Sequence, residues 1–493
     1  MKQSIGLLLA AALLTGTTLA HAQESIRDLF SHLGSTDGTQ VVSGDLTIGK
    51  DVAVLGATLL PVVGSAAIAG PSAKAKVYDG YNGIYRVAQD HMLGIDLYVT
   101  EDTGEKTLLF SDYQSGVVRR LFPISDTEFV MGPGFEVHEP AELKVRFIKG
   151  AKGTVTGIRL QPTDGAESFA ERVPLTEQDV VIANGQVRLS GTLMIPSTKG
   201  PHPAIILLHG SGPLTRYSFG PYPHFFASLG FAVLIYDKRG TGSSTGARLD
   251  ASTGALTLLP VAYYPDDLVN DALATFNFIR RRKEINPREV GVWGSSEGGM
   301  LATQVAAHSK DVAFAIDSSG FMGPLWQTIL YQTGAFLKRS GAPAAQVDEA
   351  QEFTKLWMRV SRTGEDYELF VKKREEARRD KKPWLTWTSD EFVSLEQMRW
   401  DWDHILSFTP LPALKRVTCP ILGVYGELDQ TTDASDAASN MRKVLAESGN
   451  RDFMLKVFPN AGHSLGEMPS GNRMAPGVFE TLRSWLLQRV RLP

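Results

Sequence analysis

Between Tyr78 and Leu160 the hydrophobic residues come in short runs in which apolar and polar positions alternate. Successive side chains of a β-strand point to opposite faces, so this period of two predicts strands with one buried face. Turn-forming residues separate the runs, which favours an antiparallel sheet or a small barrel. We expect a β-rich domain over residues 23–175, closed by a polar linker at 162–177, with strands at 83–87, 94–99, 107–110, 128–130, 143–147 and 155–160.

The pattern changes from Val180 onward, where nearly continuous apolar runs alternate with helix-length stretches such as residues 266–282. Strands that are apolar on both faces are typical of a mainly parallel sheet covered by helices on both sides. We expect this second domain to occupy residues 176–493, with strands at 204–208, 232–236, 290–293, 314–316, 421–425 and 454–457. Its active site should lie at the carboxyl ends of these strands.

A helical segment at about residues 321–410 interrupts the alternation and holds six of the eight tryptophans. Inserted between two strands, it would form a lid over their carboxyl ends. Its aromatic side chains could line an apolar pocket or build only the core of the lid, and both alternatives remain open. The charged run from Lys372 to Asp380 is interpreted as a solvated helix face.

The first residues, Met1–Ala22, have the pattern of a signal peptide. Lys2 precedes an apolar stretch from Ile5 to Leu14, and Ala20-His21-Ala22 resembles a cleavage site. The apolar stretch is too short to span a bilayer. We therefore expect an exported protein, periplasmic or secreted. A second apolar segment, residues 52–69, is broken by glycines and Pro61 and is predicted to form buried strands, with membrane or partner contact as the alternative.

Composition narrows the possible partners. A chain of 493 residues is long enough for two domains. The formal net charge of −4 argues against nucleic-acid binding. Cys419 is the single cysteine, so no intramolecular disulfide can form, and no ligand spacing typical of a metal site is present. We predict neither a metal nor a cofactor, and no stable membrane span.

Gly294-Ser295-Ser296-Glu297-Gly298 follows the apolar run at 290–293 and precedes a helix-like stretch. A strand, a GxSxG sequence and a helix form the context of a nucleophile elbow, in which a tight turn presents the serine. Glycine is needed on both sides because the turn crowds its neighbours. Ser296 is the predicted nucleophile, with Ser295 as the rival hydroxyl.

With this motif, residues 180–493 resemble the α/β-hydrolase superfamily. The resemblance implies an α/β-hydrolase fold with an inserted helical cap, beside the small N-terminal β-rich domain. It also implies a serine, an acid and a histidine in that chain order. Gly426-Glu-Leu-Asp429 is similar to the family's acid turn, and Phe458-Pro-Asn-Ala-Gly-His463 to its histidine loop. His463 would then be the general base and Asp429 the acid that orients it, with Glu427 and Asp433 as rivals.

Two further loops resemble parts of the same family. Leu207-Leu-His209-Gly210-Ser211-Gly212-Pro213 is similar to its oxyanion loop. One donor is assigned to the N–H of Ser211, or alternatively Gly212, and the other to the N–H of Glu297. His209 is interpreted as a structural residue of this loop. The glycine-rich stretch 236–244 lacks the endings of nucleotide-binding motifs and is interpreted as architecture beside the site.

These features predict hydrolysis of a small-molecule carboxylic ester through an acyl-enzyme, with an apolar or aromatic acyl or alcohol group. An exported peptidase or amidase of the same fold is the first alternative, because the same three residues can cleave amides. The β-rich region lacks the repeats of a propeller, which weakens that alternative. A catalytically silent binding protein is the second alternative.

Overall fold

A computed structural model of the chain describes residues 78, 80–99, 105–246, 265–388 and 394–492. The predicted signal peptide and the apolar segment 52–69 lie outside the described residues. Within the described ranges, every helix is too short or too polar to cross a membrane.

The first described domain is a closed antiparallel barrel of eight strands in sequential order. β1 pairs with both β2 and β8, which closes the barrel. Successive side chains of each strand point to opposite faces of the barrel wall: Leu108 and Phe110 fill the barrel, whereas Leu109 points outward. The strands are β1 (Gly83–Ala88), β2 (His91–Val99), β3 (Lys106–Asp112), β4 (Val118–Pro123), β5 (Glu128–Met131), β6 (Leu143–Lys149), β7 (Val155–Pro162) and β8 (Ser168–Val173).

The predicted linker at 162–177 is wrong, because this stretch holds β8 and the start of the next strand, β9 (Leu175–Asn184). β8 has Ala170 as its single buried residue, so its sequence gives little hydrophobic signal. It forms because its backbone pairs with β7 on one side and with β1 on the other. β4 also escaped prediction, since Arg119 and Arg120 interrupt its apolar pattern.

The second domain is an eight-stranded sheet in the order β16-β15-β14-β13-β11-β12-β10-β9. β10 pairs antiparallel with both β9 and β12, and the pairings among β11 to β16 are parallel. The central strands are buried along their whole length, as their apolar sequences predict. The remaining strands are β10 (Val187–Pro196), β11 (His202–Leu208), β12 (Ala232–Tyr236), β13 (Ile285–Ser295), β14 (Ala315–Ser318), β15 (Ile421–Gly426) and β16 (Phe453–Phe458).

Helices cover both faces of this sheet. α5 (Asp266–Ile279), α6 (Glu297–His308) and α12 (Ala434–Glu447) share one hydrophobic core with it. α4 (Tyr222–Ser228) and α13 (Val478–Leu487) pack into a second core on the other face. The outward residues Ile84, Leu109 and Val118 of the barrel belong to this second core, so the barrel is packed against the sheet domain.

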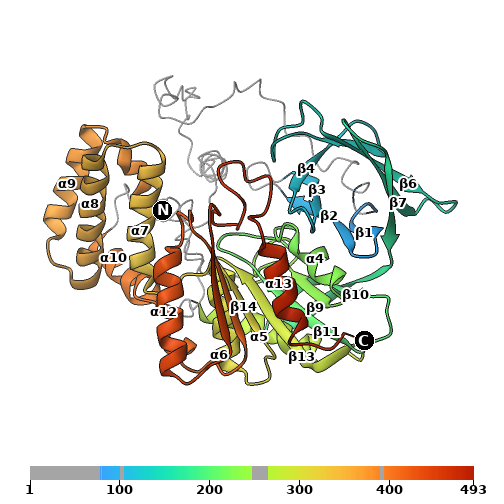
Figure 1. Cartoon of the computed structure of the whole chain (residues 1–493). Helices are drawn as coiled ribbons and strands as arrows, with labels where there is room; N and C mark the ends of the chain where they lie inside the picture. The colour runs from blue at the N-terminus through green and yellow to red at the C-terminus, as the bar shows by residue number, and fades with distance from the viewer. Residues whose placement is uncertain (1–77, 79, 100–104, 247–264, 389–393, 493) are drawn as a thin grey trace, which may run out of the picture.

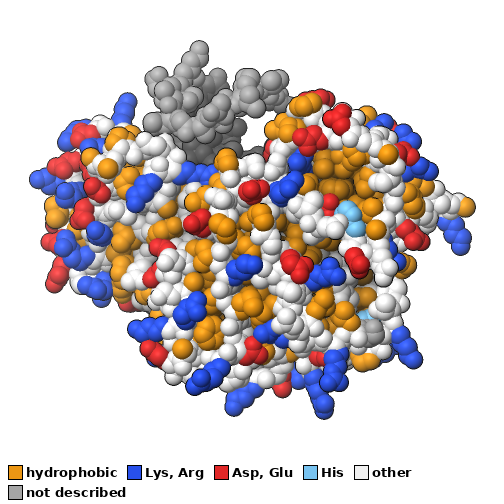
Figure 2. Space-filling view, viewed as in Figure 1, with side chains coloured by type: hydrophobic (Ala, Val, Ile, Leu, Met, Phe, Trp, Pro, Cys, Tyr) orange, Lys and Arg blue, Asp and Glu red, His pale blue; other side chains and the backbone are white. Residues whose placement is uncertain are grey.

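A group of helices is inserted between β14 and β15, and in Figure 1 it flanks the loops at one end of the sheet, opposite the barrel. Trp357 and Trp384 are buried in its core. Acidic and basic side chains are interspersed over α8 and α9 (Figure 2). The insertion comprises α7 (Leu325–Arg339), α8 (Ala344–Thr363), α9 (Tyr367–Arg379), η2 (Pro383–Trp387), α10 (Leu395–Asp401), η3 (Trp402–Leu406) and α11 (Leu411–Leu414). The predicted fold class, a layered α/β domain with a helical insertion and a separate β-rich domain, is confirmed.

Candidate active site

Ser296 lies in the tight turn between β13 and α6, with φ 58° and ψ −121°. This backbone conformation is strained for a residue with a side chain. Neighbouring glycines make the turn possible: a Cβ on Gly294 would lie 1.9 Å from the Gly298 carbonyl oxygen, and one on Gly298 would lie 2.1 Å from that of Leu208. The rival Ser295 is still part of β13 and pairs with Ser318 of β14.

Asp429 and His463 come from the loops after β15 and β16. The Asp429 carboxylate oxygen Oδ2 lies 2.7 Å from His463 Nδ1. Its other oxygen, Oδ1, accepts hydrogen bonds from the amides of Thr431 and Thr432, at 2.7 and 2.9 Å. The side chain of Asp429 is fully buried, so these bonds hold the carboxylate, and through it the imidazole, in one orientation.

The two rival acids have other contacts. Glu427 is exposed, and its carboxylate accepts a hydrogen bond from the amide of Asn460 at 3.1 Å. Asp433 caps the start of α12, where its Oδ1 accepts hydrogen bonds from the amides of Ser435 and Asp436. The geometry therefore joins His463 to Asp429 rather than to either rival.

Ser296 and His463 line the same cavity, which has a volume of about 460 Å³. Gly210 and Ser211 of the predicted oxyanion loop line it too. A Cβ on Gly210 would lie 3.4 Å from the Cβ of Ser296, so this loop runs directly beside the predicted nucleophile. Glu297 follows Ser296 as the first residue of α6, whose amino end carries partial positive charge.

A buried ion pair joins the two loops that carry the predicted oxyanion donors. Lys238 Nζ donates to Glu297 Oε2 at 2.5 Å and to the carbonyl oxygen of Gly210 at 2.9 Å. Both side chains are almost fully buried. Lys238 belongs to the stretch 236–244, and no local pattern predicts this contact because the partners are distant in the chain.

His209 is a structural residue, as its position in the loop predicted. Its Nε2 lies 3.1 Å from the carbonyl oxygen of Thr215, and its ring lies 4.2 Å from the ring of Phe219. Burial, together with the nearby Lys238 charge, lowers the pKa of His209 to about 3. The imidazole is therefore neutral at neutral pH and too weakly basic to be an effective second base for Ser296.

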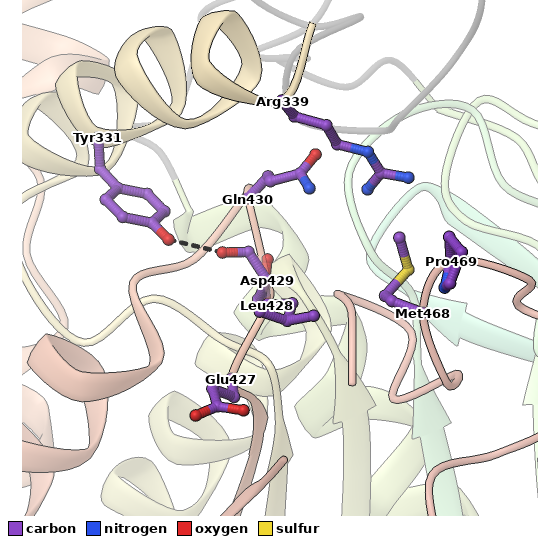
Figure 3. A pocket seen from close by; sticks show the side chains of 8 residues that line it. All are labelled: Tyr331, Arg339, Glu427, Leu428, Asp429, Gln430, Met468 and Pro469. Atoms are coloured by element: carbon purple, nitrogen blue, oxygen red, sulfur yellow. Dashed lines mark hydrogen bonds between the residues drawn. The ribbon is translucent and has the colours of Figure 1, made fainter. Parts of the chain in front are cut away.

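The helical insertion contacts the acid loop. On α7, the Tyr331 hydroxyl donates to the carbonyl oxygen of Asp429 at 2.6 Å (Figure 3). Burial raises the pKa of Tyr331 to about 12, so it stays a donor. Beside this contact lies a groove of about 450 Å³, and its lining residues Arg339, Leu428, Gln430 and Met468 also line the cavity at Ser296. The groove therefore lies next to that cavity.

The tryptophans of the insertion do not line the cavity in the described part of the chain. Trp293 of β13 lines it instead, and the insertion contributes Phe336 and Arg339. The side chain of Trp387 lies outside the described part. Of the two alternatives for these tryptophans, the core of the insertion therefore fits the described ones better, and Trp357 and Trp384 are buried there.

Four cavity residues come from the barrel, and sequence reasoning missed all of them: Tyr98, Leu109, Val118 and Phe135. Each stands in an ordinary strand or loop, so no motif marks it.

Across the described ranges, His, Cys, Asp and Glu residues form no cluster of three or more that could hold a metal ion. Cys419 is a free thiol whose pKa burial raises to about 12, which makes it unreactive.

Comparison with known proteins gives one family and several distant relatives. A model of the alpha/beta hydrolase family matches residues 205–471 of the 493. The chain is 25% identical over 323 residues to Esterase EstD of Thermotoga maritima, covering 63% of this chain and 66% of that esterase. It is 28% identical over 149 residues to the quorum-quenching protein AidA of Acinetobacter baumannii, covering 30% and 45%. The matched regions thus span less than two thirds of either relative.

Among solved structures, an esterase of Pyrococcus furiosus is similar with a TM-score of 0.40 and 18% identity, covering 64% of this chain and 92% of that one.

Proposed function

This chain belongs to the alpha/beta hydrolase family, and on that premise we propose that it is an exported serine hydrolase that cleaves small-molecule carboxylic esters. The observation that supports the proposal best is the bond between His463 and the buried Asp429. It orients an imidazole on the wall of the same cavity that Ser296 lines from its strained turn.

The proposed reaction has two halves. His463 takes the proton of the Ser296 hydroxyl while the oxygen bonds to the carbonyl carbon of the ester. The carbonyl electron pair moves onto oxygen, where the N–H groups of Ser211 and Glu297 stabilise the negative charge. When the intermediate collapses, the bond to the alcohol oxygen breaks and the alcohol takes the proton from His463. Water then repeats the sequence on the acyl-enzyme and releases the acid.

Two observations favour an ester over an amide. The relatives include a protein named as an esterase, although this chain matches only 66% of its length. The N-terminal domain is a closed barrel and not a propeller of the kind that accompanies some peptidases of this fold. Exported peptidase or amidase activity is therefore the competing outcome of the test.

The test compares purified protein on p-nitrophenyl esters and on aminoacyl anilides, with Ser296→Ala as the matched control. We expect ester hydrolysis that Ser296→Ala loses. Anilide turnover that exceeds turnover of every ester would favour the peptidase. Equal ester turnover by the variant would remove Ser296 from the mechanism.

The proposal of export rests on the sequence of Met1–Ala22. Expression of the full chain in a bacterial host, followed by fractionation and N-terminal sequencing, tests it. We expect a mature chain that begins at Gln23 outside the cytoplasm. An uncleaved chain confined to the cytoplasm would contradict export without affecting the proposed chemistry.

A further inference from the structure

We propose that the N-terminal barrel forms one wall of the substrate pocket and binds the hydrocarbon group of the ester. This inference rests on the proposed function, since it assumes that the ester is cleaved at Ser296. It gives the barrel a role in substrate specificity, although no catalytic motif was found in the sequence of this domain.

The alternation of side chains along the barrel strands explains which residues reach the site. Leu97 of β2 and Leu108 of β3 point into the barrel core. Their neighbours Tyr98 and Leu109 therefore point outward and line the cavity that contains Ser296. Val118, at the start of β4, also faces outward and lines it. The outer face of the barrel thus supplies hydrocarbon surface directly to the predicted nucleophile's cavity.

Aromatic side chains extend this surface. Phe135, in the loop after β5, packs edge-on against Tyr98 with 6.1 Å between the ring centroids. From the sheet domain, Phe219, Tyr222 and Trp293 line the same cavity, and the rings of Tyr222 and Trp293 lie 4.3 Å apart. A hydrocarbon group bound here would exchange water for apolar contacts on the barrel side and on the sheet side.

The barrel wall is fixed to the loop that carries His463. The amide of Met474 donates to the carbonyl oxygen of Gly116 at 2.7 Å, and the amide of Val118 donates to that of Asn472 at 3.1 Å. Asn472 also donates through its side chain to the carbonyl oxygen of Pro133, close to Phe135. Because backbone hydrogen bonds join the wall to this loop, the pocket is formed before substrate arrives.

The volume of the cavity limits the substrate. About 460 Å³ lies in the lower half of the range of roughly 300–1,000 Å³ that is typical of small-molecule pockets. The pocket therefore fits an ester with an alkyl chain or a single aromatic ring. Hydrocarbon groups on the acyl side and on the alcohol side share this chemistry, and the experiment separates the two.

The experiment measures kcat/KM for two ester series, one with acyl groups from acetyl to octanoyl and one of acetates with alcohols from methanol to octanol. Wild type is compared with Phe135→Ala, which removes part of the wall, and with Val118→Phe, which fills the cavity. Phe169→Ala is the matched control, because Phe169 is also on the barrel surface, on β8, and does not line the cavity. The ratio of octyl to shortest substrate is independent of the folded fraction of each preparation.

In both cavity variants we expect this ratio to fall at least about tenfold in one series, as the loss of contacts to a hydrocarbon pocket predicts. The series that responds identifies the acyl or the alcohol side, and Phe169→Ala should match wild type. Ratios that stay within about twofold of wild type in both series and both variants would overturn the proposal. An equal fall of this ratio in Phe169→Ala would also overturn the proposal.

A separate readout distinguishes failure of this inference from failure of the proposed function. If wild type hydrolyses no ester, the proposed ester activity is wrong, and the wall is tested by the labelling rates of ethyl and octyl fluorophosphonates. A lower octyl-to-ethyl ratio in the cavity variants alone would still support the wall. Unchanged ratios, or no labelling of any of the proteins, would overturn it.

Discussion

Asp96 on β2 and His224 on α4 form a buried ion pair across the interface between the barrel and the sheet domain, with 2.6 Å between Oδ1 and Nδ1. Burial alone would lower the pKa of His224, but the carboxylates of Asp96 and Glu177 raise it above its ordinary value of 6.5 overall. When His224 is protonated, the pair contributes to the stability of the interface between the barrel and the sheet domain.

Replacement of this carboxylate tests the contribution. Asp96→Asn leaves a buried imidazole without its opposite charge, and we expect it to lower the free energy of unfolding by about 3 kcal/mol. Because the folded-state pKa of His224 is raised, the stabilisation is fully present below pH 6.5 and is lost as the pH rises through the folded-state value. Urea unfolding at about pH 6 and about pH 9 should show the larger difference at the lower pH. A pH-independent difference would contradict this assignment.

Lys238 is predicted to position the two oxyanion loops. Lys238→Met removes the bonds to Glu297 and Gly210 and takes away the positive charge beside the buried Glu297 carboxylate. We expect kcat to fall by about a hundredfold, as for loss of an oxyanion donor, with little change in KM. The matched control is Arg239→Met, because Arg239 forms a comparable buried pair with Asp271 away from the site. It should lose similar stability but keep kcat. An equal loss of kcat in both variants would show that Lys238 only stabilises the fold and does not position the oxyanion donors.

Asp429 and Glu427 lie two positions apart in one loop, so substitution of each tests which carboxylate orients His463. Asp429→Asn should lower kcat by roughly 10⁴-fold, because the amide no longer holds His463 in the tautomer needed to accept a proton. Glu427→Gln should change kcat little, since Glu427 is exposed and bonds only to a backbone amide among the contacts described. Steady-state kinetics on one ester measures both. The opposite order would assign the acid to Glu427.

Asp317, at the end of β14 beneath the serine turn, predicts a pH dependence of stability. Its carboxyl is bonded to the Tyr425 hydroxyl at 2.6 Å and to the Gly320 amide at 2.8 Å, and burial raises its pKa to about 7 from 3.8. Between these values the folded chain binds a proton that the unfolded chain has lost, so the free energy of unfolding falls as the pH rises.

The variant Asp317→Asn removes this titration. It should match wild type near pH 4 and be more stable by on the order of 3 kcal/mol near pH 8, as measured by urea unfolding at both pH values. A wild type that remains the more stable protein near pH 8 would show that the ionised carboxylate is tolerated in the fold.

The sequence predicts those parts of the molecule whose signals are local. The strands β11 to β16 follow from the length and apolarity of each run, whereas β10 was not predicted. Gly294-Ser295-Ser296-Glu297-Gly298 adopts the turn that its glycines allow. The loops that carry Asp429 and His463 each follow a predicted strand, and parallel strands bring their carboxyl ends to one edge.

Other features depend on contacts between segments that are distant in the chain. β8 forms because it closes the barrel, although Ala170 is its single buried residue. Leu109 and Val118 look like ordinary strand residues, and only the packing of the barrel on the sheet domain brings them to the cavity. The pairing of Lys238 with Glu297 spans 59 positions in the chain, so it too lay beyond local patterns.

Covalent labelling identifies the nucleophile of the proposed reaction. Wild type, Ser296→Ala and the matched Ser295→Ala are treated with a fluorophosphonate, and the modified residue is located by peptide mass mapping. We predict one label per chain on Ser296 in wild type and in Ser295→Ala, and none in Ser296→Ala. Labelling of Ser296→Ala at the wild-type rate, or a label on Ser295 in wild type, would show that Ser296 is not the nucleophile.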